Sequence, residues 1–565
     1  MSKMKNHDRN EEEEYENTYR KMQGMEIETE DDITSFKRFV DHTGTKRTGV
    51  FGTTANLVNN IVGAGIIGMP YAVRQSGLVA GIVLVIVVGL LMDKSLNILV
   101  QTAAFNPILK HKGLNTYEDC MYYPFGLWGR AFIQLSMFVV AYGAMVGYFI
   151  TIKDTVPPII GFAEGFQPEL VLIVISAFLI LPLSMQRDIA SLSVTSLLSV
   201  TLDIVLVFFV VLYSPVIKNV SEQGGIAQII KNDAISPNIF IGLGVLSDAM
   251  CCQHSSFLLF ESLENHKRIR WATVSAISIS TSAFLFLILG VSGFLGFGDE
   301  TQGDVLNNFP EGSMEANVAR GLLAITMIFT YPMELFVGRH VLVDLFHNSQ
   351  IECPISELQD RGEGSFLQRI MLNRRQKMTL GLYMLTLVPA LFFDDLGPVL
   401  SITGAVGGSC LAYIGPGLVY IGVNSKLFLK WSDNLISSRH RKPLWWYAFG
   451  FPIWCTIAER ASLGLDERLA GKKVAEIDLE ESSQLSNSAI EEEMAQPTTN
   501  DFLVALFFVV FGVIALVAGI GTNIYVQLNP VDRVVLHHNP MRVVGYIILN
   551  ETKTKSSYVS YVNQC

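Results

Sequence analysis

The hydrophobic residues of this chain are gathered into runs of roughly 17–25, a length that crosses a bilayer as a helix. Within the hydrocarbon region no water can satisfy backbone N–H and C=O groups, so the chain must hydrogen-bond them internally. Half of the 565 residues are hydrophobic and only 16% are charged, against about a quarter in soluble domains. The sequence therefore predicts an all-α integral membrane protein.

Eleven such runs predict eleven transmembrane helices, the first ten arranged as five plus five. Their expected limits are 50–74, 78–104, 128–152, 169–185, 190–213, 236–261, 271–296, 317–345, 377–394, 397–423 and 502–526. Lysine and arginine occur mainly in every second loop, which is the pattern of loops kept in the cytosol. We therefore place the N-terminus in the cytosol and the C-terminal tail on the opposite side of the membrane, called the far side below.

Charge and composition divide the rest of the chain. The expected parts are a disordered acidic cytosolic tail (1–47), a ten-helix core (48–425), a cytosolic loop (426–501) with an interfacial segment (443–458) and a disordered linker, an eleventh helix (502–526), and a lumenal or extracellular tail (527–565). The sequons at Asn219 and Asn550 fall on the far side and are glycosylation candidates. The net charge of −11 gives no reason to expect a nucleic-acid partner, whereas the lipid bilayer is an obligatory one.

The stretch NNIVGAGIIGMPYAV (59–73) places helix breakers in the middle of the first span. An interior glycine costs a helix roughly 0.5–1 kcal/mol relative to alanine, and an interior proline costs about 3 kcal/mol. Two explanations fit. The glycines could allow close packing between helices, or they could unwind the chain so that backbone groups hold a ligand.

The sixth span has an interruption of its own, with Gly242 and Gly244 followed by several polar residues. Interrupted spans at matching positions of two halves indicate a transporter site at the membrane midplane. Exposed N–H groups suit a carboxylate, and exposed carbonyls suit an ammonium group or a cation, so an amino-acid zwitterion fits both. The expected substrate-binding residues are Gly63, Ala64, Gly65, Ile66, Ser247, Asp248 and Cys251.

Asp248 is the most informative single residue of the sixth span, because a central aspartate costs on the order of 2.5–3.5 kcal/mol on insertion scales. It could bind a cationic substrate, carry a proton or ligate sodium, or it could be a structural partner of His254. His254 could itself carry a proton, since histidine titrates near physiological pH. We expect no cofactor apart from a coupling ion, H⁺ or Na⁺, and no bound metal.

Several segments resemble the amino acid/auxin permease family, and most closely its fungal vacuolar and sodium-coupled neutral amino acid transporters. They are NLVNNIVGAGIIGMPYAVRQSG (56–77), LPLSMQRDIASLSVTS (181–196), GVLSDAMCCQHSSFLLFESL (244–263), VSGFLGFGDETQGDVLNNFP (291–310) and TYPMELFVGRHV (330–341). The resemblance implies an inverted-repeat fold in which spans 1, 2, 6 and 7 rock against 3, 4, 8 and 9. It also implies that Asn59 and Thr330 help to hold a coupling ion, with Thr326 as the rival threonine.

The sequence thus predicts secondary active transport of amino acids by alternating access, with proton coupling and a vacuolar or lysosomal membrane favoured. One alternative is a sodium-coupled symporter, with the plasma membrane as its other location. A second is an amino-acid sensor that signals to a cytosolic regulator through its N-terminal tail. No nucleophile–base pair or metal-ligand spacing appears outside the spans, so we do not expect an enzyme.

Overall fold

A computed structural model describes residues 48–105, 109, 116–160, 168–185, 192–265, 267–310, 312–347, 374–436, 451–470 and 499–528. Within these ranges nearly every residue is helical, and the one β-bridge pairs Thr48 with Leu263. The all-α prediction is confirmed. Residues 1–47 and 471–498, where a disordered tail and linker are predicted, lie outside the described residues, so their disorder stays a prediction. Of the tail predicted at 527–565, residues 527 and 528 belong to the last helix and the rest lies outside the described residues.

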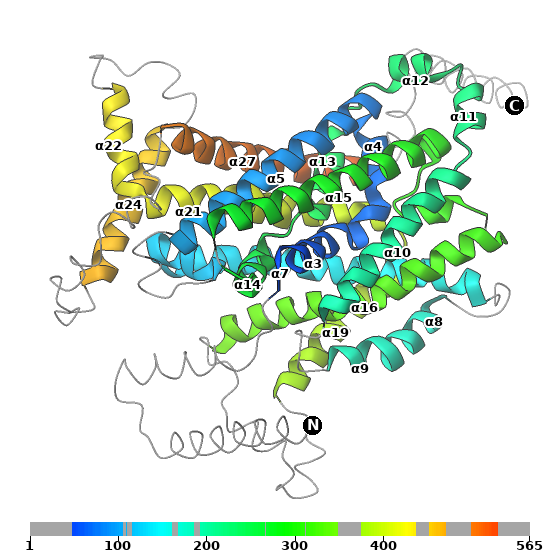
Figure 1. Cartoon of the computed structure of the whole chain (residues 1–565), viewed down its shortest axis with the longest axis horizontal. Helices are drawn as coiled ribbons and strands as arrows, with labels where there is room; N and C mark the ends of the chain where they lie inside the picture. Colours follow the sequence, from blue (N-terminus) through cyan, green and yellow to red (C-terminus); the bar gives the residue numbers. More distant parts are fainter. Residues whose placement is uncertain are drawn as a thin grey trace, which may run out of the picture. The chain divides into compact units, whose positions relative to one another are not determined.

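The helices follow one another along the chain and pack side by side (Figure 1). In order they are α3 (Val50–Val62), η1 (Ala64–Gly68), α4 (Met69–Ser76), α5 (Leu78–Phe105), α7 (Tyr117–Ile160), α8 (Pro168–Ile175), η2 (Ser176–Ile180), α9 (Leu181–Ser184), α10 (Leu192–Tyr213), α11 (Val216–Glu222), α12 (Ile226–Asp233), α13 (Ile239–Ala249), α14 (Gln253–Ser262), α15 (Arg268–Phe297), η3 (Gly298–Glu300), η4 (Val305–Asn308), α16 (Met314–His347), α19 (Arg374–Phe392), α20 (Leu396–Thr403), η5 (Gly404–Ile414), α21 (Gly415–Val423), α22 (Ser425–Ile436), α24 (Phe451–Ala470) and α27 (Thr499–Leu528).

Each of the eleven predicted spans coincides with one helix or with a run of consecutive helices. Among the described residues, six helices are long and apolar enough to cross a membrane, and two bent pairs raise that number to eight. The bent pairs are Val50–Val62 with Gly65–Ser76, and Leu197–Tyr213 with Val216–Glu222. The count of eleven and the internal repeat stay predictions.

Contacts between helix ends agree with the predicted alternation of helix direction. At the predicted far side, the Ser236 N–H donates to the Ser76 carbonyl over 2.8 Å, which joins the end of the first span to the start of the sixth. At the predicted cytosolic side, Thr48 and Leu263 join the opposite ends of the same two spans. The first and sixth spans therefore run antiparallel.

The core is formed where the helices face one another, and large apolar side chains also cover the outer surface. Leu90, Phe208 and Val517 are 68%, 65% and 65% exposed. Apolar groups exposed on this scale suit contact with lipid chains, which satisfy no polar group. This outward face is what a bilayer requires.

The predicted cytosolic loop contains two helices that pack against each other and against the last span. In α22, Trp431 stacks on Phe502 of α27 with ring centroids 5.5 Å apart. The second helix, α24, includes the end of the predicted interfacial segment and continues to Ala470, further than the sequence indicated. Residues 443–450 lie outside the described residues.

Candidate functional site

The first span breaks at its midpoint, as predicted. Its first half, α3, ends at Val62, and Gly63 leaves helical geometry with φ 18° and ψ −135°. A short 3₁₀ turn then leads into α4, where Pro70 occupies the first turn and needs no helical N–H partner. The two halves are bent by 46°.

The sixth span is also broken, inside the predicted interruption. Gly242 and Gly244 lie within the continuous helix α13, and the chain unwinds at residues 250–252, between the glycines and the polar residues that follow from Gln253. The break comes just after Asp248, so this carboxylate lies near the end of a half-helix. The two glycines themselves do not mark the break, because they serve another purpose.

That purpose is close packing between helices, the alternative explanation for the glycines. A Cβ atom on Gly65 would lie 2.5 Å from the Cβ and 2.7 Å from the Cα of Ala249. One on Gly244 would lie 2.5 Å from the carbonyl oxygen of Ser401. Real Cβ atoms do not approach so closely, so the two broken spans touch through backbone. Gly63 differs, because the atom nearest to a Cβ on Gly63 would be the Asn59 carbonyl oxygen of its own helix, at 3.6 Å.

A hydrogen-bonded chain joins the two breaks on their predicted cytosolic side. The Asn60 amide donates to the Ser255 hydroxyl over 2.6 Å. The Ser255 hydroxyl in turn donates to the Cys252 carbonyl over 3.0 Å, inside the unwound segment. The cytosolic halves of the first and sixth spans are therefore coupled directly.

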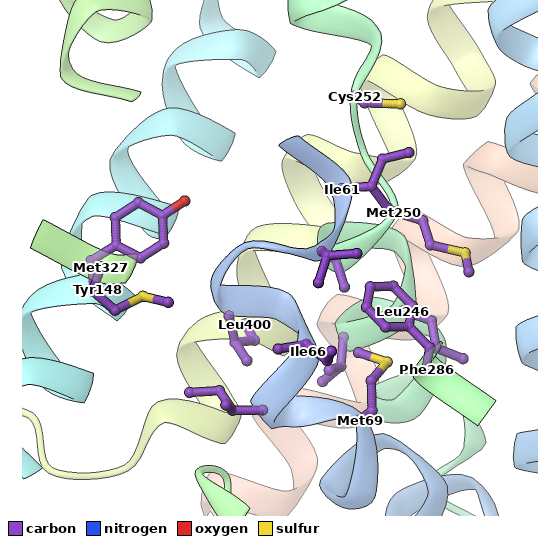
Figure 2. Close-up of a cluster of buried hydrophobic side chains, with 14 of the residues drawn as sticks. Ile61, Ile66, Met69, Tyr148, Leu246, Met250, Cys252, Phe286, Met327 and Leu400 are labelled. Carbon is purple, nitrogen blue, oxygen red and sulfur yellow. The ribbon is translucent and has the colours of Figure 1, made fainter. Parts of the chain in front are cut away.

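Tyr148 of α7 marks the centre of the site, although the sequence did not single it out. It is buried, and its hydroxyl would lie 3.8 Å from a Cβ on Gly63. In Figure 2, Tyr148 and Met327 lie on one side of the broken first span, and Leu246 and Met250 lie on the other. The site is thus enclosed by helices from both halves of the chain.

Three acidic residues act electrostatically on this tyrosine. The charges of Glu334, Asp248 and Asp203 all act on the Tyr148 hydroxyl, and they come from α16, α13 and α10. Asp203 was not predicted, although a lone aspartate in the apolar run of α10 is the signal that could have found it. In a medium of low dielectric constant, such a group of like charges favours binding a proton or a cation.

The side chains of Asp248 and Asp203 differ in how far they are exposed. Asp248 is only half-buried, and no hydrogen bond to its carboxylate is found among the described residues, so the carboxylate can contact a ligand. Its backbone carbonyl accepts from the Cys251 N–H over 3.1 Å. Asp203 is 1% exposed. His254 does not pair with Asp248, the structural alternative considered from sequence. Its Nε2 lies 3.5 Å from Oε1 of Glu334 instead.

Thr326, Thr330 and Glu334 are four residues apart, so they form one buried stripe on α16. The Thr330 hydroxyl donates to the Thr326 carbonyl over 2.7 Å, and its lone pairs stay available as acceptors. Asn59 is 3% exposed in the last turn of α3, and its carbonyl accepts from the Gly63 N–H.

The other predicted substrate-binding residues are placed as follows. The Ser247 hydroxyl lies 3.0 Å from that of Tyr413, so it faces η5. Ile66 is fully buried in the apolar core, Cys251 lies in the unwound segment, and Ala64 begins η1.

The glycosylation candidates stay predictions. The Asn219 amide already donates to the Leu295 carbonyl over 2.8 Å, and Asn550 lies outside the described residues.

The chain matches the family described as transmembrane amino acid transporter protein over residues 46–446. It belongs to this family.

Relatives in the family carry more specific names. The chain is 29% identical over 389 residues to "Vacuolar amino acid transporter 2" of Saccharomyces cerevisiae, covering 67% of this chain and 77% of that one. It is 28% identical over 382 residues to "Putative sodium-coupled neutral amino acid transporter 11" of Bos taurus, covering 66% and 75%. Among solved structures, a sodium-coupled sialic acid symporter aligns with a TM-score of 0.43 and 13% identity, covering 76% of this chain and 91% of that one.

The resemblance seen in the sequence motifs is confirmed. The family transports amino acids across membranes, so this protein is a multi-pass amino acid transporter and not an enzyme.

The transporter also has a polar cavity of about 400 Å³ at its predicted far side, away from the two breaks. On its wall, Lys153 donates to the Ala390 and Phe393 carbonyls and pairs with Asp394 at 2.8 Å. These bonds fasten the corner between α19 and α20 to α7.

A loop beside this cavity, residues 301–310, holds a buried acid. Burial, and next the charge of Asp154, raise the pKa of Asp304 to about 7, while the Leu306 N–H and Arg320 oppose the shift. The loop reaches several helices, since its Thr301 carbonyl accepts from Arg74 of α4. A change of pH near neutrality therefore acts on this loop at the far side.

Proposed function

We propose that this protein is a proton-coupled amino acid transporter that works by alternating access. The observation that carries the proposal is that three intramembrane acids on three spans, Asp203, Asp248 and Glu334, all act electrostatically on Tyr148, whose hydroxyl lies beside the break of the first span. Ionisable residues inside a membrane are costly and mark ion or proton pathways. Three acids on three different spans can bind a proton in one state and release it in another.

Asp248 is the expected partner of the substrate ammonium group. It is half-buried next to the unwound residues 250–252, and Gly65 packs on the neighbouring Ala249. The substrate carboxylate is then expected at the backbone N–H groups released at residues 63–66. The two charges of a zwitterion would thereby contact both broken spans at once, which couples binding to their motion.

The membrane of an acidic organelle, a vacuole or a lysosome, fits proton coupling. The yeast relative named above is a vacuolar transporter. A proton gradient across that membrane is a direct energy source for a site built from carboxylates.

The test is uptake of labelled amino acids into proteoliposomes under a pH gradient or a sodium gradient, with and without Asp248→Asn. We expect the pH gradient to drive uptake and Asp248→Asn to raise the KM for the substrate strongly. The matched control is Asp93→Asn, which changes an acid of α5 that already accepts from Ser275 and Asn97. Uptake that responds to sodium at fixed pH and ignores the pH gradient would overturn the proposal.

Sodium coupling is the second candidate, because Asn59 and Thr330 are both buried on elements beside the break and the bovine relative bears a sodium-coupled name. Under this candidate, Thr330→Ala or Asn59→Asp abolishes sodium-driven uptake. If transport is proton-coupled, uptake by the Thr330→Ala variant still responds to the pH gradient.

A further inference from the structure

Asp203 is the most isolated ionisable group in the described part of the transporter. It lies near the middle of α10, about 16 Å from either end at 1.5 Å per residue. Its side chain is 1% exposed, and its Oδ2 has no hydrogen-bond partner. A polar atom this deep in the membrane and without a partner calls for a functional explanation.

No basic side chain from the packed elements is available to neutralise Asp203. Helix α10 packs against α3, α15 and α16. Helix α3 has no charged residue, and α15 has none from 271 to 297. The titratable and charged groups of α16 with described side chains are Glu315, Arg320, Tyr331, Glu334, Arg339 and His340.

The two arginines of α16 make contacts elsewhere. Arg320 donates to the Leu306 and Phe309 carbonyls of the far-side loop. Arg339 donates to the Thr379 hydroxyl on α19. From α7, Tyr148 contributes a neutral hydroxyl that also interacts with Glu334 and Asp248. Among the described residues, the group inside the membrane on which the Asp203 charge acts is therefore the neutral hydroxyl of Tyr148, and no basic side chain compensates that charge.

An ionised carboxylate in such surroundings is so unfavourable that the group takes up a proton or a cation instead. We propose that Asp203 is the residue that carries the coupling proton, while Asp248 binds the substrate. This assignment rests on the proposed proton-coupled function. It separates the two tasks that Asp248 alone would otherwise have to perform.

The proton step is an exchange with water. A proton from the acidic side adds to a carboxylate oxygen of Asp203 and gives the neutral acid. After the spans have rocked, the same O–H bond breaks and the proton passes to water on the other side. The charges of Asp203 and Asp248 both act on the Tyr148 hydroxyl, so a proton on Asp203 is sensed at the tyrosine that also senses Asp248. Asp248 itself is left to hold the substrate ammonium group.

The experiment uses the full-length protein in proteoliposomes and two assays. Exchange of labelled for unlabelled amino acid without any gradient reports binding and alternating access. Accumulation under a pH gradient reports coupling. For Asp203→Asn, which imitates the protonated acid, we expect exchange to continue while gradient-driven accumulation falls to the equilibrium level. For Asp203→Glu, which can still titrate, we expect accumulation to return with a shifted pH midpoint.

The controls are Ser199→Ala, a buried position one turn earlier on α10, and Asp93→Asn on α5. Both are expected to keep exchange and coupling. If wild-type protein is driven by protons and Asp203→Asn is driven equally well, Asp203 is not the carrier and the proposed function stands. If wild-type protein is driven by sodium alone, both proposals fail. If both Asp203 variants lose exchange and substrate-induced thermal stabilisation, the role is structural and the assignment is overturned.

Discussion

Glycine residues of the first span that look equivalent in the sequence have different tasks in the structure. Gly63 is where the helix ends, and its surroundings leave room for a side chain. Gly65 has no such room, because the backbone of Ala249 approaches it directly. The substrate site therefore depends on Gly65 for contact between the two broken spans and on Gly63 for their irregular backbone.

Gly65→Ala is expected to destabilise the transporter by about 1–3 kcal/mol and to abolish exchange, because the new methyl group must push α13 away from the first break. Thermal unfolding of the purified protein and exchange in proteoliposomes measure the two effects. Gly381→Ala on α19 is the control, since no atom lies within 4 Å of its added Cβ. Equal melting temperatures for the two variants would contradict this account of Gly65.

Sequence reasoning at this scale found some residues and missed others for identifiable reasons. Asp248 stood out because it lies among several polar residues and beside a family motif. Asp203 has apolar neighbours on both sides and belongs to no motif, so only its charge marked it. Tyr148 gave no signal, because its importance comes from its distance to Gly63, 85 positions away in the chain.

At the scale of elements, the helices were predictable and their irregularities were only partly so. Apolar length placed each predicted span on a helix or a run of helices, although α7 extends from Tyr117 to Ile160, well beyond the predicted 128–152. The first break was predictable from Gly63 and Pro70. The break at 250–252 contains no glycine or proline that could mark it in the sequence. The π-helical stretch η5 was not predicted either, and we attribute it to packing against its neighbours.

The buried acid of the far-side loop 301–310 makes the stability of the protein depend on pH. The pKa of Asp304 is about 7 in the folded protein, whereas its ordinary value is near 4. Between pH 4 and pH 7, the folded protein therefore holds a proton on Asp304 that the unfolded chain has lost. Its contribution to stability therefore falls as pH rises from about 4 to 7, by at most about 1.4 kcal/mol per pH unit, and is constant above. An acidic far side would thus tighten this loop.

Asp304→Asn is expected to remove this part of the pH dependence. Between pH 5 and 7 the melting temperature of the wild-type protein should fall as pH rises, and that of the variant should fall less steeply. The informative quantity is therefore the slope of each curve between pH 5 and 8. Glu300→Gln, an exposed acid close by, is the control and should keep the wild-type slope. A wild-type slope in Asp304→Asn would show that Asp304 does not titrate in this range.

Under the proposed mechanism the whole molecule alternates between two states, and the resemblance to the family implies a moving boundary between spans 1, 2, 6 and 7 and spans 3, 4, 8 and 9. The pair His254–Glu334 crosses this boundary, because α14 belongs to the sixth span and α16 is the eighth. It lies in the predicted cytosolic half. The contact between Nε2 of His254 and Oε1 of Glu334 would hold that half closed, and loss of the contact would release it.

Glu334→Gln is therefore expected to favour the state in which the cytosolic half is open, because it removes the carboxylate that lies against His254. Cys251 and Cys252, buried in the unwound segment, report the opening, so a soluble thiol reagent should label them several-fold faster than in the wild-type protein. Cys251→Ser and Cys252→Ser identify the labelled thiol, and Glu315→Gln, exposed in the first turn of α16, is the matched control. If Glu334→Gln and Glu315→Gln label at the same rate, the pair does not hold the two groups of spans together. Faster labelling in Glu334→Gln alone would identify the contact that opens when the transporter turns toward the cytosol.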